Sequence, residues 1–237
     1  MDTAEALTPP AILAEGVERA YPVGDRLVHA LRGIDLSIAP GQFIALKGRS
    51  GSGKTTLLNC LGGLDRPTAG AIAIHGRSLL DLDEGQLTHW RRSEVGFIFQ
   101  SLGLLPTMSA YENVELMLRI ARMPREERRP RALTCLELVG LGKWSDHRPY
   151  EMSGGQQQRV AIARAIANRP RLILADEPTG ELDSETTREV LALFREIIHA
   201  EGMTMLMATH DDLAEEYVDE VLRLEDGRIS ASHSQAP

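Results

Sequence analysis

Apolar residues in the first third of the chain form short runs that end at turn residues. The runs lie at 34–38, Phe43–Lys47 and 71–75, and Pro40-Gly41 separates the first two. Short β-rich runs with Gly and Pro between them are typical of strands. Lys54–Leu61 follows a glycine-rich loop and contains no helix breaker, so it predicts the order strand, loop, helix.

The last third of the chain continues this alternation. Residues 172–175 and 203–208 are continuous apolar runs of the kind found in buried parallel strands. Residues 183–200 alternate polar and apolar positions at helical spacing, and 221–229 are expected to form a hairpin that turns at Asp226-Gly227. Strands therefore alternate with helices, which predicts an α/β fold.

The middle of the chain, 101–167, has a helical pattern. Its amphipathic candidates are 117–122 and 132–139, and Pro124 and Pro149 interrupt the pattern. We interpret this segment as a helical lobe inserted between the two α/β halves.

Composition and charge narrow the class of protein. The 237 residues are 43% hydrophobic and 25% charged, as in ordinary soluble globular proteins, which argues against disorder. A net charge of −8 repels phosphate backbones, so no nucleic acid partner is expected. Cys60 and Cys135 are far apart, which favours neither a disulfide framework nor a zinc site. Apolar runs fall short of the roughly 18 residues of a membrane span, so any membrane role is expected to come through another chain.

A glycine-rich motif follows the strand predicted at Phe43–Lys47. Residues 48–55 read Gly-Arg-Ser-Gly-Ser-Gly-Lys-Thr and match G-x-x-x-x-G-K-[ST] in full, in the strand and helix context that the pattern requires. Backbone N–H groups would face the phosphates, Lys54 would add a positive charge at the β and γ groups, and the Thr55 hydroxyl would ligate magnesium. A nucleoside triphosphate site is therefore expected at Gly48, Ser50, Gly51, Ser52, Gly53, Lys54, Thr55 and Thr56.

Two carboxylates follow the apolar run 172–175. Asp176 and Glu177 stand at the carboxyl end of a predicted strand, where ligands of open α/β sheets bind. Asp176 would hold magnesium through water, and Glu177 would orient or deprotonate an attacking water. An isolated Asp-Glu-Pro would more simply end a strand and cap a helix, but a P-loop in the same chain favours the catalytic interpretation.

A second glycine motif separates the P-loop families. Residues 152–159 read Met-Ser-Gly-Gly-Gln-Gln-Gln-Arg and precede an apolar helical run. The motif resembles the Leu-Ser-Gly-Gly-Gln signature of ABC transporter nucleotide-binding subunits, with Met152 in the first place. A helix N-terminus with flexible glycines suits an anion, and the resemblance implies that it closes on the γ-phosphate held by an opposite subunit. The simpler alternative is an N-cap followed by a loop. The expected signature residues are Ser153, Gly154, Gly155 and Gln156.

Four further positions resemble family residues in the family's order. Tyr21 resembles the aromatic residue that stacks on adenine, and Gln100 resembles the glutamine that reaches the magnesium and the lytic water. His210 resembles the switch histidine that contacts the γ-phosphate. Asp183 belongs to a segment that resembles the D-loop at the dimer interface, where Glu181 departs from the small or amide residue common there. The resemblance implies the catalytic residues Glu177, His210 and Gln100 and the metal-binding residues Thr55, Gln100 and Asp176.

The resemblance spans 12–229 and implies a fold. The expected class is α/β, with a P-loop NTPase (RecA-like) core, an antiparallel β subdomain and an inserted helical lobe. The expected organisation is a single ATP-binding domain at 11–230, with the core and β subdomain at 11–100 and 168–230, the helical lobe at 101–167 and a polar tail at 231–237.

Residues 67–70, 104–106 and 112–114 are similar to the lipoprotein-release and macrolide-efflux (LolD/MacB-type) subgroup. The implied function is hydrolysis of ATP, with Mg²⁺, by an ATP-dependent homodimer that powers a separate FtsX/MacB-like membrane permease. The implied location is the cytoplasmic face of the cell inner membrane. Apolar residues after Gln100, among them Leu105, are expected to dock the permease.

Two alternatives to the transport function are weighed. The first is an FtsE-like regulatory ATPase that transmits force to an extracytoplasmic partner without transport. The second, a soluble P-loop kinase or GTPase, is disfavoured because the sequence lacks Asn-Lys-x-Asp for guanine and because the signature motif would be unexplained.

Overall fold

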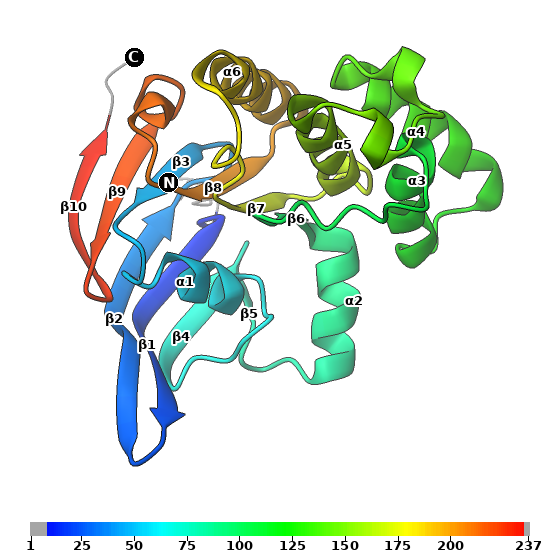
Figure 1. The fold of residues 1–237 in the computed structure, drawn as a ribbon. Coiled ribbons are helices and arrows are strands. Elements are labelled where there is room, and N and C mark those ends of the chain that lie inside the picture. The colour runs from blue at the N-terminus through cyan, green and yellow to red at the C-terminus, as the bar shows by residue number, and fades with distance from the viewer. Residues whose placement is uncertain (1–8, 235–237) are drawn as a thin grey trace, which may run out of the picture.

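The computed structural model describes residues 9–234, which form two β-sheets and a helical lobe (Figure 1). The larger sheet has six strands in the order β10-β9-β3-β8-β7-β6. Strands β9, β3, β8, β7 and β6 pair in parallel, and β10 runs antiparallel to β9. The strands are β3 (Phe43–Lys47), β6 (Val95–Ile98), β7 (Leu172–Asp176), β8 (Thr204–Thr209), β9 (Glu220–Glu225) and β10 (Arg228–Ser234).

Strand β3 is continuously apolar up to its last residue because both faces of the sheet are covered. Phe43 and Ala45 belong to the core on the side of α5 (Gly154–Ile166) and α6 (Ser184–Glu201). Ile44 and Leu46 belong to a second core, which lies between the sheet and α1 (Lys54–Leu61). Packing on both faces therefore holds β3 in place, and the glycine-rich loop begins directly after its last residue, Lys47.

The smaller sheet is antiparallel, with the order β2-β1-β4-β5. Its strands are β1 (Ile12–Val23), β2 (Arg26–Ile38), β4 (Ala69–Ile74) and β5 (Arg77–Ser78). The β1–β2 hairpin projects from the molecule (Figure 1) and is longer than the strand predicted at 34–38. Its outer half has no buried face, since Val23 and Leu27 are 60% and 65% exposed, so no alternation of apolar and polar residues marks it.

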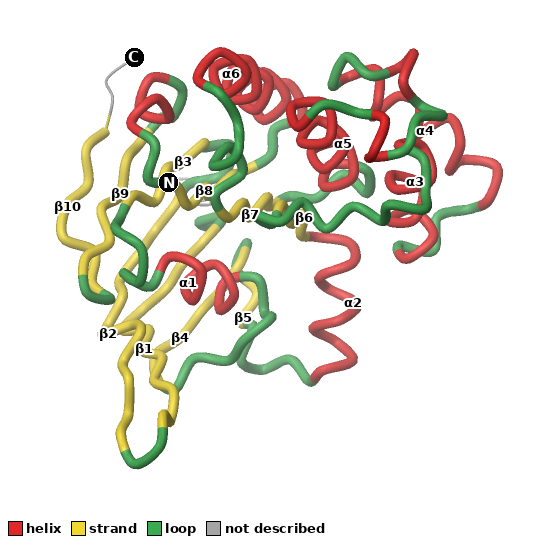
Figure 2. Tube along the Cα trace, viewed as in Figure 1, coloured by secondary structure: helices red, strands yellow, loops and turns green. Residues whose placement is uncertain are grey.

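The helical lobe consists of α3 (Ala110–Ile120), α4 (Arg125–Leu138) and α5, which lie beside the edge strand β6 (Figure 2). Helix α3 begins at a capping box in which Ser109 Oγ accepts from the Glu112 N–H and Glu112 Oε2 accepts from the Ser109 N–H. The predicted helical segments 117–122 and 132–139 overlap the last turns of α3 and α4, which end earlier, at Ile120 and Leu138. Apolar periodicity marks the buried turns of a helix, whereas the caps decide where the helix begins.

Two elements extend beyond the predictions. Helix α2 (Glu84–Glu94) begins at a capping box of Asp83 with Gln86 and buries Leu87 and Trp90. Strand β10 continues past position 230 to Ser234, so residues 231–234 of the predicted polar tail belong to the larger sheet. An edge strand needs only backbone hydrogen bonds on one side, which a polar sequence supplies equally well. Residues 235–237 of that predicted tail lie outside the described residues. Within 9–234 no helix is long and apolar enough to cross a membrane.

Candidate nucleotide site

The P-loop connects the end of β3 to the start of α1, as its strand and helix context predicts. A Cβ atom on Gly48 would lie 2.3 Å from the carbonyl oxygen of Leu224, and one on Gly53 would lie 2.5 Å from that of Ala30. Gly53 also has φ 109°, a left-handed conformation that suits glycine. Close approach of other backbone segments therefore requires glycine at both positions.

Lys54 and Thr55, the first residues of α1, both reach groups outside the loop. The Lys54 side chain is buried; its Nζ donates to the Gly48 carbonyl at 2.8 Å and lies 3.3 Å from Glu177 Oε1. The Thr55 hydroxyl donates to Asp176 Oδ2 at 2.7 Å. The helix start and the end of β7 thus place a cation, a hydroxyl and two carboxylates together.

Glu177 has an unusual backbone conformation. Its φ is 47°, in the left-handed region, which for a residue other than glycine costs about 1–3 kcal/mol. The Glu177 N–H donates to the Ala208 carbonyl at 2.9 Å, which fixes this geometry. Glu177 Oε2 lies 2.8 Å from His210 Nδ1 and accepts the His210 backbone N–H at 3.3 Å. The turns after β7 and β8 therefore aim these two side chains at each other.

These residues surround one pocket of about 560 Å³. The lining residues are Ala30, Arg49, Ser50, Gly51, Gly53, Lys54, Thr55, Thr56, Gln100, Asp176, Glu177 and His210. Gly48 and Ser52 line a neighbouring pocket, which shares Arg49, Ser50, Gly51 and His210 with the first. The Ser52 hydroxyl is buried, and within the described residues its oxygen has no hydrogen-bond partner. A buried hydroxyl of this kind can donate to an anion held by the loop.

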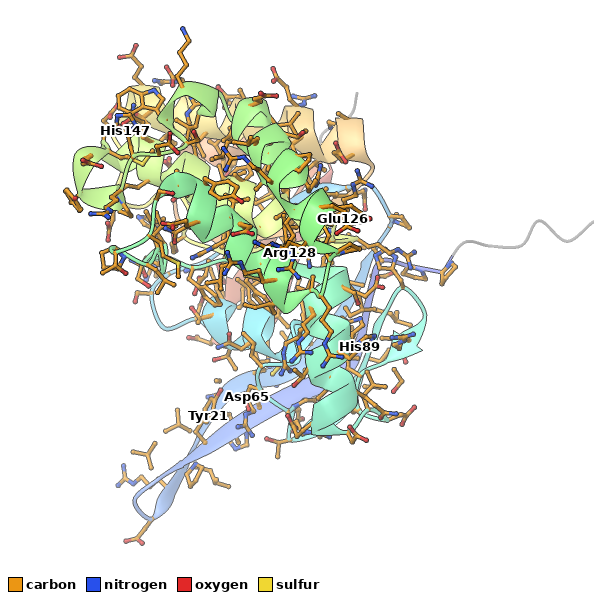
Figure 3. The ribbon with its side chains drawn as sticks, turned by 90° about the vertical axis from the view of Figure 1, so that its right-hand side faces the viewer. Tyr21, Asp65, His89, Glu126, Arg128 and His147 are labelled. Carbon is orange, nitrogen blue, oxygen red and sulfur yellow. The ribbon has the colours of Figure 1, made fainter. Side chains whose placement is uncertain are left out.

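Tyr21 lies outside the lining of this pocket, on the projecting part of the β1–β2 hairpin, where it pairs with Val28 close to the turn (Figure 3). Its hydroxyl donates to Asp65 Oδ2 at 2.6 Å, and the Arg19 guanidinium covers its ring at 4.4 Å from the centroid. Arg19 also pairs with Asp65 through two hydrogen bonds of 2.7 and 2.9 Å. Burial and the Asp65 carboxylate raise the pKa of Tyr21. Arg19 and Tyr21 are two residues apart on one strand, and this spacing could have predicted that their side chains lie on the same face.

The signature residues form a separate site. Ser153 caps α5, accepting from the Gln156 N–H at 3.3 Å, while Gln156 Oε1 accepts from the Ser153 N–H at 3.0 Å. A Cβ on Gly155 would lie 2.6 Å from Thr186 Cγ2, so this glycine lets α5 approach the start of α6. Asp183 caps α6 by accepting from two backbone N–H groups at 3.0 Å. Of the described residues, none from 153–156 lines the Lys54 pocket.

Sequence reasoning missed Arg164, which connects the signature helix α5 to the loop that follows Gln100. It stands on α5, and its guanidinium donates to the carbonyls of Leu102 and Gly103, just after Gln100. Burial lowers the pKa of Arg164. The sequence does contain a hint of this role, because Arg164 lies in an apolar helical run and a buried charged residue there needs hydrogen-bond partners from another segment.

The fold and the Lys54 pocket define the class, a P-loop nucleotide hydrolase. The chain matches the ABC transporter family over residues 31–180. It is 43% identical over 222 residues to an uncharacterized ABC transporter ATP-binding protein, MJ0796, of Methanocaldococcus jannaschii, covering 92% of this chain and 94% of that protein. It is 47% identical over 223 residues to a macrolide export ATP-binding/permease protein, MacB, of Hyphomonas neptunium, covering 94% of this chain and 34% of that protein.

Solved structures agree with this assignment. The dimeric structure of MJ0796 in a post-hydrolysis state, bound to ADP and Pi, has a TM-score of 0.88 at 40% identity and covers 95% of this chain and 99% of that one. CbiO1 of Clostridium perfringens, part of an ABC transporter complex, has a TM-score of 0.86 at 30% identity over 95% of this chain and 89% of that one. The predicted fold class is confirmed. The chain belongs to the ABC transporter family, as an ATP-hydrolysing subunit of the lipoprotein-release and macrolide-efflux subgroup.

Proposed function

We propose that this subunit works as an ATP-dependent homodimer and powers a separate membrane permease from the cytoplasmic face of the inner membrane. The observation that carries the proposal is that the P-loop and the carboxylate of Glu177 line one pocket, where Lys54 Nζ lies 3.3 Å from Glu177 Oε1. The regulatory alternative has no support from the relatives described above, which are named as transporter components.

The P-loop would bind the phosphates of ATP. Lys54 would hold the β and γ groups, and the buried Ser52 hydroxyl would donate to them together with the backbone N–H groups at the start of α1. The adenine base would stack on the ring face of Tyr21 opposite Arg19, which already covers the first face. The Asp65 hydrogen bond would keep that ring in place.

Mg²⁺ would be held by Thr55, Asp176 and Gln100. The Thr55 hydroxyl and the Asp176 carboxylate are 2.7 Å apart, and Gln100 lines the same pocket. Hydroxyl, carboxylate and amide oxygens are the hard ligands that Mg²⁺ prefers, so the donor set fits the ion. The bound ion would neutralise charge on the phosphates.

Hydrolysis would depend on Glu177 and His210. The Glu177 carboxylate would take the proton of the attacking water as general base. His210, at 2.8 Å from Oε2, would orient that carboxylate and contact the γ-phosphate. The left-handed backbone of Glu177 would keep the carboxylate at the end of β7 and directed into the pocket.

A second copy of the chain would complete each site. The signature residues Ser153–Gln156 form an anion-binding helix start that lies apart from the P-loop of the same chain, so they are available to the P-loop of a partner. Asp183 would cross the interface beside them. The dimeric structure of MJ0796 supports this assembly.

The permease would dock beside Gln100. Leu105 is 40% exposed, whereas Leu104 and Tyr111 pack against the core of the lobe. Asn113 is buried and holds the intervening loop through bonds to the carbonyls of Leu105 and Met108 at 3.1 Å each. An exposed leucine on a fixed loop suits an apolar partner surface.

The substitution Glu177→Gln tests the reaction and the assembly together. The amide keeps the size of the carboxylate but accepts no proton, so turnover should fall by about 10²–10⁴-fold. ATP should stay bound, and the mass measured by light scattering should rise from monomer to dimer when ATP is added.

Glu196→Gln, an exposed carboxylate on α6, is the matched control and should keep wild-type turnover. Wild-type turnover in Glu177→Gln would overturn the assignment of the base. A mass that stays monomeric at high protein concentration with ATP would overturn the self-sufficient homodimer.

A further inference from the structure

Lys47 ends the central strand with a buried charge. The four residues before it in β3 are fully buried and apolar, and the Lys47 side chain is itself only 7% exposed. In β3, Lys47 lies in register with Thr209 of β8 on one side and with Arg223 of β9 on the other. An ammonium group at such a position needs charged partners, because burial without them is strongly unfavourable.

Both partners of Lys47 come from one short segment. Its Nζ forms ion pairs with Asp212 and Glu215, which lie in η3 (Asp212–Glu216), the turn that follows β8. Burial alone would lower the pKa of Lys47, but the two carboxylates raise it, so the side chain is charged. Glu215 Oε1 also lies 3.6 Å from Nη2 of the Arg223 guanidinium.

His210 lies just before this segment, between the end of β8 and η3. The Asp211 N–H donates to Thr209 Oγ1 at 3.0 Å, and Asp211 Oδ1 accepts from the Leu213 N–H at 2.9 Å. His210 is thus followed directly by residues fixed to β8 and, through Lys47, to β3. The His210 side chain is 68% exposed, so packing does little to hold it.

We propose that Lys47 is a positioning residue for the Glu177–His210 pair: its ion pairs with Asp212 and Glu215 fix the segment after His210 against the strand that begins the P-loop. The inference rests on the proposed roles of Glu177 and His210. It gives this subunit a direct connection between the phosphate cradle, which starts at Gly48, and the segment that directs His210.

Lys47→Met removes the charge and keeps the length of the side chain. The kcat of the full-length protein should fall about tenfold, a coupling within the range found for networked residues. The affinity for the fluorescent analogue mant-ATP should change less than about twofold, because Lys47 acts on His210 and not on the phosphates. Lys143→Met, at an exposed lysine of the helical lobe, is the matched control and should keep wild-type values.

Two further measurements keep the result interpretable. Asp212→Asn with Glu215→Gln removes the same ion pairs from the more exposed side and should reproduce the loss of kcat if Lys47→Met folds poorly. In a His210→Ala background, Lys47→Met should lower the single-turnover rate less than about twofold, since a residue that acts through His210 has no effect without it.

The opposite results would overturn the inference. A tenfold weaker affinity for mant-ATP with kcat unchanged would make Lys47 a phosphate ligand, and equal losses with and without His210 would make its role merely structural. Glu177→Gln, measured in parallel, distinguishes failure of the proposed catalytic pair from failure of the Lys47 inference. If it keeps wild-type turnover, the proposed catalytic pair fails and the Lys47 inference fails with it; if it is inactive while Lys47→Met is fully active, only the inference fails.

Discussion

Single side chains explain why departures from the signature sequence leave its geometry intact. Met152 takes the place of leucine and is 7% exposed within the core of the lobe. Leucine and methionine have similar volumes, so this exchange keeps an apolar anchor just before Ser153. Glu181 departs from the D-loop pattern but is exposed, and the Asp183 cap follows it unchanged. Neither departure disturbs the helix starts at Ser153 and Asp183, which are proposed to face a partner subunit.

Burial should make both cysteines unreactive. It raises the pKa of Cys60 to about 12 and that of Cys135 to about 11, so at pH 8 almost no thiolate is present. The native protein should give close to zero thiols with Ellman's reagent at pH 8 and two in denaturant. Raising the pH to 9 should leave the native value unchanged, since both values still lie above it. Rapid reaction of a native cysteine at pH 8 would contradict this.

At the scale of elements, α5 connects two parts of the proposed site, the signature motif at its start and the loop after Gln100 at its end. Its first residues form the signature site, and its last turn carries Arg164, which holds the carbonyls that follow Gln100. Leu102 and Gly103 adopt left-handed backbone conformations, with φ of 55° and 58°. One helix therefore connects the proposed partner-facing surface at Ser153 with the loop that follows Gln100, a proposed metal ligand.

Replacing Arg164 should loosen that loop. Arg164→Met removes charged donors from two carbonyls, and hydrogen bonds of this type contribute about 1.5–3 kcal/mol, so the free energy of unfolding in urea should fall by about 2 kcal/mol. Limited proteolysis should cut first near 101–103. The control is Arg195→Met, at an exposed position of α6, which should change neither. Equal protease resistance of Arg164→Met and wild type would show that the loop does not depend on this arginine.

At the scale of the whole molecule, two surfaces are suited to binding further protein chains. The P-loop pocket and the signature helix start belong to different lobes, which supports the proposal that a second copy of the chain completes each site. Beside them, Leu105 stands exposed on the loop that Asn113 holds. Both surfaces suit further chains, one a copy of this protein and the other the proposed permease.

Leu105→Glu should separate docking from catalysis. A charge at the exposed position should abolish co-purification with the permease from membranes, while basal ATPase activity of the isolated subunit stays within about twofold of wild type. Leu138→Glu, at an apolar residue 41% exposed on α4, is the control and should keep co-purification. Unchanged co-purification of Leu105→Glu would contradict the docking surface, and loss of both properties would indicate core packing instead.

Much of the fold followed from local patterns. The buried strands were predicted because continuous apolar runs such as 172–175 need cover on both faces of the sheet. The P-loop residues were found because their spacing encodes a turn into a helix, which is local geometry. The outer hairpin and α2 were missed, since exposed strands and helix caps leave little trace in hydrophobic periodicity.

By itself, the sequence determined the alternation of strands and helices in the first and last thirds of the chain and the positions of the two glycine motifs, because each depends on neighbours along the chain. Only the tertiary structure decided which distant groups meet. Lys47 pairs with Asp212 across 165 positions, and the Thr55 hydroxyl reaches Asp176 across 121. Tyr21 shares Asp65 with Arg19. These contacts depend on how two cores pack on both faces of one sheet, and no local pattern of residues encodes that packing.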